Sequence, residues 1–115
     1  MNHAHSDCIF CKIVAGSMTS NIIAQTDELI VIKDIAPKAP IHYLIIPKKH
    51  VKDIQSLERT DCCLASKMVL MAQRLSKETT GAHDFKFVIN SGYEAGQRVF
   101  HLHAHFLAGP LLAEI

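Results

Sequence analysis

The chain has 115 residues, of which 49% are hydrophobic and 20% are charged, and its formal net charge is +1. These values predict one globular domain with a sizeable core, and they argue against a general attraction to nucleic acid or to a membrane surface. No apolar run is long enough to cross a membrane, and the first residues lack the features of a signal peptide. We therefore expect a cytoplasmic protein with a loose tail at residues 1–7 and a single domain at residues 8–115.

The first half of this domain predicts short elements joined by turns. β-branched runs on either side of a polar turn are typical of a hairpin, and two closely spaced prolines are typical of an ordered loop. The most N-terminal apolar run fits a short helix, and a strand fits it nearly as well. In chain order we expect a short helix at 8–15, strands at 22–25 and 29–33, a loop at 34–40 and a strand at 41–46.

One long helix is predicted over residues 60–80, with Thr60 placed to cap its start and Gly81 placed to end it. The helix carries two apolar stripes. The larger stripe consists of Leu64, Met68, Met71 and Leu75, and the smaller of Cys62, Ala65, Val69 and Ala72. A helix that is apolar on two sides must bury both of them. We therefore expect one stripe to face a sheet and the other to face a second copy of the chain.

The remaining sequence predicts a strand at 85–90, a glycine-rich loop at 91–97 and a last strand through 99–107. Short strands around a single long helix predict an α+β domain with an antiparallel sheet.

The last predicted strand contains His101, His103 and His105, which alternate with apolar residues. Side chains on a strand alternate between its faces, so these imidazoles would share one face, each about 7 Å from the next. The other face would carry Phe100, Leu102, Ala104 and Phe106. Each buried imidazole needs partners for two ring nitrogens, so a core gains little from such a row. The row therefore indicates a functional site.

Two chemistries are open for this row. In the first, neutral His103 attacks phosphorus, while His105 and main-chain amides of the loop 91–98 meet the phosphate charge. Two glycines in that loop, Gly92 and Gly96, would let it curl into an anion-binding nest. In the second, the three histidines bind a hydrolytic zinc ion. No Asp or Glu within residues 98–113 is present to orient the rings for that purpose.

Other residues form a second candidate cluster. Cys8 and Cys11 have the spacing of half a structural zinc site, and His50 and His101 are candidates for the other two ligands. A pair of reduced core thiols and a redox motif are the alternatives. Two further cysteines are adjacent in the predicted helix, where a disulfide between them is not expected. His42 lies in a predicted strand with strongly apolar neighbours, and we therefore expect it to join the histidine site.

Two segments of the chain resemble the histidine triad (HIT) family, and most closely its Hint-like branch of nucleotide hydrolases. The segment 96–107, GQRVFHLHAHFL, looks like the family signature of three alternating histidines. The segment 34–50, DIAPKAPIHYLIIPKKH, looks like the family's second block. With the helix between them, the resemblance covers residues 8–110.

The resemblance implies a HIT-like fold, with about five antiparallel strands, one long helix and a short N-terminal helix, assembled as a homodimer that binds a purine nucleotide such as AMP. It implies that His103 is the nucleophile, that His101, His105 and His42 are its catalytic partners, and that Asp34 holds the ribose hydroxyls. Further substrate contacts are implied for Phe10, Ile35, Leu44, Asn90, Gly96, Gln97 and Arg98.

The resemblance also implies one structural zinc ion per chain, because bacterial members with a Cys-x-x-Cys pair hold zinc. The implied ligands are Cys8, Cys11, His50 and His101. Arg98 departs from the family pattern, in which a small hydroxyl residue is common, and adds a charge near the phosphate.

The leading hypothesis is an enzyme that hydrolyses the P–N or P–O bond of nucleoside 5′-phosphoramidates or adenylates, with dinucleoside polyphosphates as further candidates. The reaction would pass through a nucleotidyl-His103 intermediate. The alternatives are a non-catalytic nucleotide-binding adaptor and a zinc-dependent hydrolase that uses the triad as metal ligands. Neither nucleic acid nor a membrane is expected as a partner.

Overall fold

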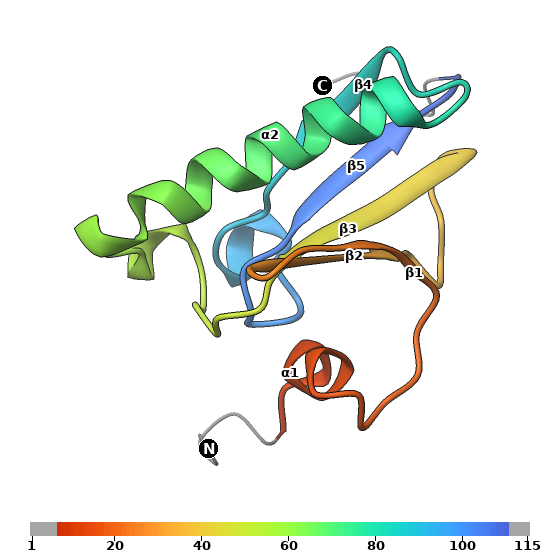
Figure 1. Ribbon diagram of the computed structural model, residues 1–115. Coiled ribbons are helices and arrows are strands. Elements are labelled where there is room, and N and C mark those ends of the chain that lie inside the picture. The colour runs from red at the N-terminus through yellow and green to blue at the C-terminus, as the bar shows by residue number, and fades with distance from the viewer. Residues whose placement is uncertain (1–6, 111–115) are drawn as a thin grey trace.

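The computed structural model describes residues 7–110, which form a five-stranded antiparallel sheet with a helix against each face (Figure 1). The strands lie in the order β1-β2-β3-β5-β4. Their bounds are Ile22–Gln25 (β1), Leu29–Lys33 (β2), Ile41–Pro47 (β3), Phe85–Val88 (β4) and Ala104–Ala108 (β5). The helices are α1 (Ile9–Val14) and α2 (Cys62–Glu78), with 3-10 turns at Ile54–Ser56, Arg59–Asp61 and Tyr93–Ala95. The predicted α+β class, its five strands, its long helix and its short N-terminal helix are confirmed.

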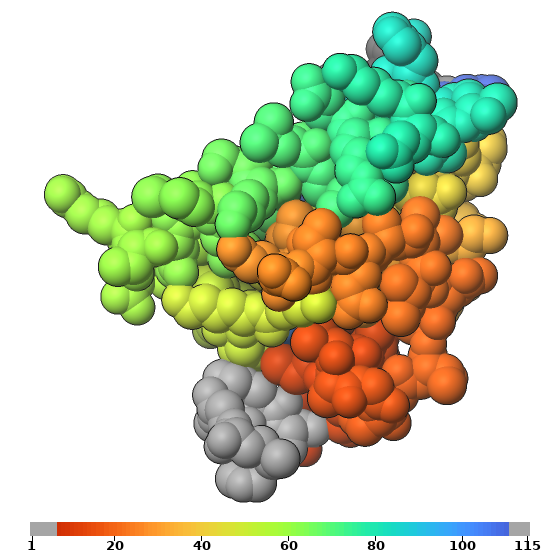
Figure 2. All heavy atoms as spheres, in the orientation of Figure 1, coloured from red at the N-terminus to blue at the C-terminus, as the bar shows by residue number. Residues whose placement is uncertain are grey.

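The two faces of the sheet support separate apolar cores. Leu29 and Val31 of β2 pack in the core beneath α2, whereas Ile30 and Ile32 pack in the core with Phe10 of α1. Successive strand residues point to opposite faces, so a strand buried on both faces reads as an unbroken apolar run. Figure 2 shows the same arrangement with all heavy atoms in the same orientation, with α2 (green) above the β1–β2 hairpin (orange) and α1 (red) below it.

The start of α2 differs from the prediction. Because a 3-10 turn over Arg59–Asp61 precedes it, the helix begins at Cys62, and Asp61 rather than Thr60 occupies the N-cap position. The Asp61 carboxylate reaches back to accept the N–H of Glu58 and also binds the Lys49 ammonium at 2.6 Å. Thr60 was the wrong choice of cap because this carboxylate organises the turn.

The larger predicted stripe of α2 is buried as expected, with each member at most 7% exposed: Leu64, Met68, Met71 and Leu75. Ala72 was wrongly placed in the outer stripe, because at 1% exposed it belongs to the core beneath the helix. Cys62, Ala65 and Val69 remain on the outer surface.

The histidine row does not lie within a single strand. Extending the β3–β5 register past Ala104 would bring Leu102 opposite Pro47, which has no N–H to donate. The Leu102 N–H instead donates to the Val51 carbonyl, and β5 begins only at Ala104. The predicted strand over 99–107 is therefore wrong in its first half, and β4 likewise ends at Val88 rather than at residue 90.

Phe100 is a further correction. Leu102, Ala104 and Phe106 are buried in the core beneath α2, as predicted, but Phe100 is 42% exposed. It precedes the strand, so the alternation of faces does not apply to it, and its ring lies 5.7 Å from the Lys52 ammonium.

Within residues 7–110, no helix is both long enough and apolar enough to cross a membrane. Residues 1–6 of the predicted tail and residues 111–115 of the predicted domain lie outside the described part of the chain. The predicted boundary between tail and domain therefore stays a prediction.

Candidate active site and metal centre

His42 and His105 meet on the face of the sheet that carries α1. Leu44 of β3 is paired with His105 of β5, so His42, two residues earlier on β3, is a diagonal neighbour on the same face. The Nε2 of His42 lies 2.9 Å from the Nδ1 of His105. The Lys38 main-chain N–H donates to the Nδ1 of His42 at 3.0 Å. A neutral imidazole carries one proton, so the proton of His42 is on Nε2.

Asp34 stands beside this pair. Its Oδ2 lies 3.4 Å from the Nε2 of His42, and its Oδ1 accepts the Ala36 N–H at 2.8 Å. Its side chain is 16% exposed, so the carboxylate is ordered by the protein and still open to a ligand. This arrangement suits a group that accepts hydrogen bonds from paired hydroxyls.

His103 is 8% exposed and lies at the centre of the site. Its Nδ1–H donates to the His101 carbonyl at 2.8 Å, which leaves the lone pair on Nε2. Its ring centroid is 5.2 Å from that of His105 and 5.1 Å from that of Phe10, whose ring packs edge-on against it.

The histidines of the site resist protonation. Burial lowers the pKa of His103 and of His42, although the nearby Asp34 carboxylate opposes the shift in both. Burial, and then the charges of His103 and His42, lowers the pKa of His105 to about 4. The three rings are therefore neutral near pH 7, as a histidine nucleophile requires.

The second cluster brings Cys8, Cys11, His50 and His101 together, with their ligand atoms all within 4.8 Å of one another. Cys8 is the N-cap residue of α1, and its sulfur accepts the Cys11 N–H at 3.4 Å, so one helical turn positions both thiols. Burial, followed by a hydrogen bond and charge from Cys8, raises the pKa of Cys11 to about 11. A cation that binds the Cys11 thiolate must therefore displace a proton.

The geometry of this cluster fits a tetrahedral zinc ion. The Nδ1 of His101 lies 3.3 Å from the Cys8 sulfur and 3.5 Å from the Cys11 sulfur, and the Nδ1 of His50 lies 3.3 Å from the Cys11 sulfur. Tetrahedral Zn–S and Zn–N bonds place ligand atoms about 3.3–3.8 Å apart. The Nε2–H of His101 donates to the Pro47 carbonyl at 2.6 Å, so its lone pair faces the sulfurs.

Asp34, His42 and His105 also bring three possible ligand atoms within 4.8 Å of one another. Here the hydrogen bonds argue against a metal ion. Because Lys38 donates to the Nδ1 of His42, its Nε2 carries the proton, and a metal ion at Nε2 would require a doubly deprotonated ring or a broken Lys38 bond. This group is suited to holding a proton rather than a metal ion.

The glycine-rich loop is held by its own hydrogen bonds. Gln97 is 1% exposed, its Oε1 accepts the Gly92 N–H at 2.8 Å, and its Nε2 donates to the carbonyls of Lys52 and Val99. Gly92 and Gly96 have φ values of +102° and +100°, as the predicted curl requires. The amides of residues 92, 95, 96 and 97 donate within the loop, so they do not form the predicted open nest.

The other implied substrate residues lie in different environments. Arg98 stacks on the Tyr93 ring at 4.1 Å, and its Nη1 donates to the carbonyls of Tyr93 and Gln97. Ile35 is 97% exposed, whereas Phe10 and Leu44 are buried in the core beneath the site. Asn90 is half-buried, with its side chain close to the Gly96 backbone.

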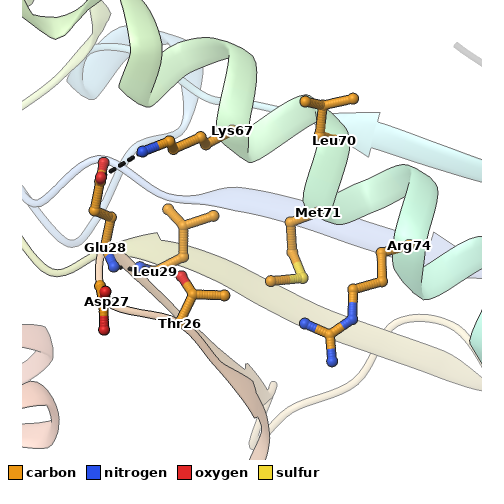
Figure 3. Close-up of a pocket in the computed structure, with 8 residues that line it drawn as sticks. All are labelled: Thr26, Asp27, Glu28, Leu29, Lys67, Leu70, Met71 and Arg74. Carbon is orange, nitrogen blue, oxygen red and sulfur yellow. Dashed lines mark hydrogen bonds and ion pairs between the residues drawn. The ribbon is translucent and has the colours of Figure 1, made fainter.

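A surface groove of about 380 Å³ lies away from these residues, between the β1–β2 turn and α2 (Figure 3). Glu28 and Lys67 form an ion pair at one end, and Arg74 lies at the other. None of the predicted site residues lines this groove.

Two main-chain groups that matter here, the Lys38 N–H and the Pro47 carbonyl, could not be predicted from the sequence. Main-chain groups carry no residue-type signal, and only the prolines at positions 37 and 40 hinted at a rigid loop.

The fold and the two clusters define a small α+β protein in which buried histidines lie beside a Cys/His cluster that is compatible with zinc. Residues 7–114 match the family model described as "Scavenger mRNA decapping enzyme C-term binding". A HIT-like protein of Chlamydia muridarum is 40% identical over 107 residues, which are 93% of this chain and 85% of that protein. Protein HitA of Neisseria gonorrhoeae is 37% identical over 105 residues, 91% of this chain and 98% of HitA. The chain therefore belongs to the histidine triad family.

Solved structures show the same fold. A histidine triad protein from Clostridium difficile has a TM-score of 0.92 at 33% identity, covering 100% of this chain and 99% of that one. A HIT family hydrolase from Legionella pneumophila has a TM-score of 0.86 at 33% identity, covering 92% and 96%. A Zn-bound histidine triad family protein from Mycobacterium smegmatis has a TM-score of 0.79 at 30% identity, covering 90% and 75%.

We expect about one zinc ion per chain in protein purified without chelator, measured by elemental mass spectrometry. A ligand set that joins distant segments stabilises the fold directly, so chelation should lower the melting temperature by several degrees. Cys11→Ser should abolish the zinc content, whereas Cys62→Ser, at an exposed cysteine outside the cluster, should retain it. Metal-free wild-type protein would contradict the assignment.

We also expect the stability to depend on pH through His105. Its pKa of about 4 in the folded protein lies below the unfolded value near 6.5, so the unfolded chain binds this proton more tightly. The free energy of unfolding should therefore fall as the pH decreases from about 6.5 toward 4. His105→Asn should flatten this slope by up to about 1.4 kcal/mol per pH unit. Urea unfolding at matched zinc content measures it, and parallel slopes for the two proteins would refute the prediction.

Proposed function

We propose that this protein hydrolyses the P–N or P–O bond of nucleoside 5′-phosphoramidates or adenylates, with dinucleoside polyphosphates as further candidates. The hydrogen bond from His103 Nδ1–H to the His101 carbonyl carries the proposal, because it leaves a lone pair on Nε2. Burial lowers the pKa of His103, so the lone pair is present near pH 7. A neutral imidazole nucleophile splits one difficult displacement at phosphorus into two easier ones.

In the first step, the Nε2 of His103 forms a bond to the α-phosphorus as the P–N or P–O bond to the leaving group breaks. The departing atom takes a proton from His105, which is thereby returned to its neutral form. That proton enters with the substrate, because a phosphate anion beside His105 raises a pKa that is about 4 without it.

In the second step, His105, now neutral with its remaining proton on Nδ1, removes a proton from water with the Nε2 lone pair. The hydroxyl oxygen bonds to phosphorus, and the bond between phosphorus and His103 Nε2 breaks. The products are a nucleoside monophosphate and the protonated leaving group. One water molecule is consumed, and His105 releases the proton taken from water as the product phosphate leaves.

Three observations support a nucleotide as the substrate. The Asp34 carboxylate is ordered and 16% exposed, which suits acceptance of hydrogen bonds from two ribose hydroxyls. Ile35, at 97% exposed, follows it along the chain and offers an apolar surface for a purine base. The Legionella neighbour is named a HIT family hydrolase, which supports hydrolysis as the reaction class.

The cysteine-containing cluster has a structural role in this proposal. Zinc bound there would join α1 to the segments that carry His50 and His101, and it supplies no group to the reaction. None of the four cysteines, all within the described residues, forms a disulfide, which is compatible with the expected reducing compartment.

Replacing His103 with Ala should lower single-turnover hydrolysis of adenosine 5′-phosphoramidate by a factor of about 10² or more, because the covalent route is lost. Its affinity for AMP should change by less than about 1.5 kcal/mol, the net value of one hydrogen bond. Rapid-quench assays and calorimetric titration measure the two effects. Turnover near the wild-type rate would remove His103 as the nucleophile.

Asp34→Ala is the matched variant and should show the opposite pattern, with AMP binding weakened more than the chemical step. If the wild-type protein binds AMP but turns over no member of a panel of phosphoramidates and adenylates, the non-catalytic adaptor replaces the enzyme as the function.

We propose a homodimer formed across the outer stripe of α2, which now consists of Cys62, Ala65 and Val69. Light scattering in dilute solution should report about twice the mass of one chain. Val69→Asp should give monomers, because it places a charge in the interface. Leu70→Asp is the control, since Leu70 is 58% exposed against 57% for Val69 but lies on a different side of the helix. Equal effects of both substitutions would exclude this interface.

A further inference from the structure

The loop before β3 presents one main-chain donor to the active site. The nitrogen of the Lys38 N–H lies 3.0 Å from the Nδ1 of His42, and His42 is only 4% exposed. The loop is fixed at its start, where Asp34 donates its N–H to the His42 carbonyl and accepts the Ala36 N–H on its carboxylate. Lys38 also stands between the two prolines of the loop. The donor is therefore ordered before any substrate arrives.

The His42–His105 hydrogen bond permits two arrangements of protons while both rings are neutral. In the first, His42 donates from Nε2, and His105 accepts on Nδ1 and carries its own proton on Nε2. In the second, His105 donates from Nδ1 and presents a lone pair on Nε2. The second arrangement places the His42 proton on Nδ1, where it would face the Lys38 N–H donor.

Asp34 favours the same arrangement independently. Its Oδ2 lies 3.4 Å from the Nε2 of His42, and an ionised carboxylate only accepts hydrogen bonds. Both neighbours of His42 therefore place its proton on Nε2. The other charged or titratable groups that act on His105 are His103 and the Lys38 ammonium.

We propose that the main-chain N–H of Lys38 is a positioning group that acts through His42 to make His105 present an N–H, rather than a lone pair, at Nε2. This inference rests on the proposed function for its purpose: in the resting protein, before a proton arrives with the substrate, neutral His105 then meets the phosphoryl group as a hydrogen-bond donor. His103, fixed by the His101 carbonyl, presents a lone pair at the corresponding Nε2. Main-chain hydrogen bonds thus make His105 a hydrogen-bond donor and the neighbouring His103 a nucleophile.

The direct test is long-range ¹H–¹⁵N NMR of the zinc-loaded protein with ¹⁵N-labelled histidine at pH 7. We expect His42 and His105 to carry their protons on Nε2 and His103 to carry its proton on Nδ1. Spectra of His105→Asn and His103→Asn assign the signals. A wild-type His42 protonated on Nδ1, or a His105 protonated on Nδ1, would overturn the proposal without any reference to activity.

A pair of substitutions isolates the main-chain group. Lys38→Pro removes the N–H together with the ammonium, whereas Lys38→Ala removes only the ammonium. We expect Lys38→Pro to populate the Nδ1–H form of His42 and to lower turnover about tenfold or more relative to Lys38→Ala, with AMP affinity within about threefold. Circular dichroism and zinc content establish that both variants are folded.

The outcomes separate the two proposals. If Lys38→Pro is folded and its tautomers match those of Lys38→Ala, the positioning role is wrong even if the enzyme is active. If the tautomers shift as expected but no substrate is turned over, the proposed function fails and the positioning role stands. If Lys38→Pro does not fold, the tautomers of His42 and His105 in the wild-type protein decide whether the positioning role is correct.

Discussion

The hydrogen bonds of His101 determine how the rest of the site is placed. This residue is fully buried, its Nε2–H is held by the Pro47 carbonyl, and its Nδ1 faces the two sulfurs of the N-terminal segment. Its own carbonyl accepts the Nδ1–H of His103. One residue therefore belongs to the Cys/His cluster through its side chain and orients the His103 ring through its main chain. The two centres cannot be positioned independently.

Main-chain partners divide chemically identical side chains into different roles. The ring of His101 gives its proton to a carbonyl, so its lone pair is directed at the sulfurs. The ring of His42 receives an N–H, so its proton is directed at a neighbouring imidazole. Two clusters that contain similar ligand types thus differ in what they can hold, one a cation and the other a proton. Residue type alone does not distinguish them.

Periodicity predicted the architecture, because the sheet and α2 are each built on regular burial. The residues of the unbroken apolar run of β2 are buried alternately in the cores on the two faces of the sheet. The apolar stripe of α2 that includes Met68 is buried in one of these cores. The prediction failed where the pairing of β3 with β5 stops. In the continued register Leu102 would lie opposite Pro47, which has no N–H, so His101 and His103 lie outside β5. The roles of the candidate site residues stay predictions, and most of those residues were named through the family resemblance. The Lys38 N–H and the Gln97 side-chain bonds were not predicted, since they depend on contacts between distant segments.

The cysteine-containing cluster also bears on how the two ends of the domain are joined. Cys8 and His101 lie 93 positions apart in sequence, and His50 lies between them. The four ligand atoms come within 4.8 Å of one another only because the fold brings these distant segments together. An ion held there would be released when the chain unfolds, so its binding free energy would add to the free energy of folding. Unlike a disulfide, such a link would tie the N-terminal helix to the rest of the domain in the native state alone.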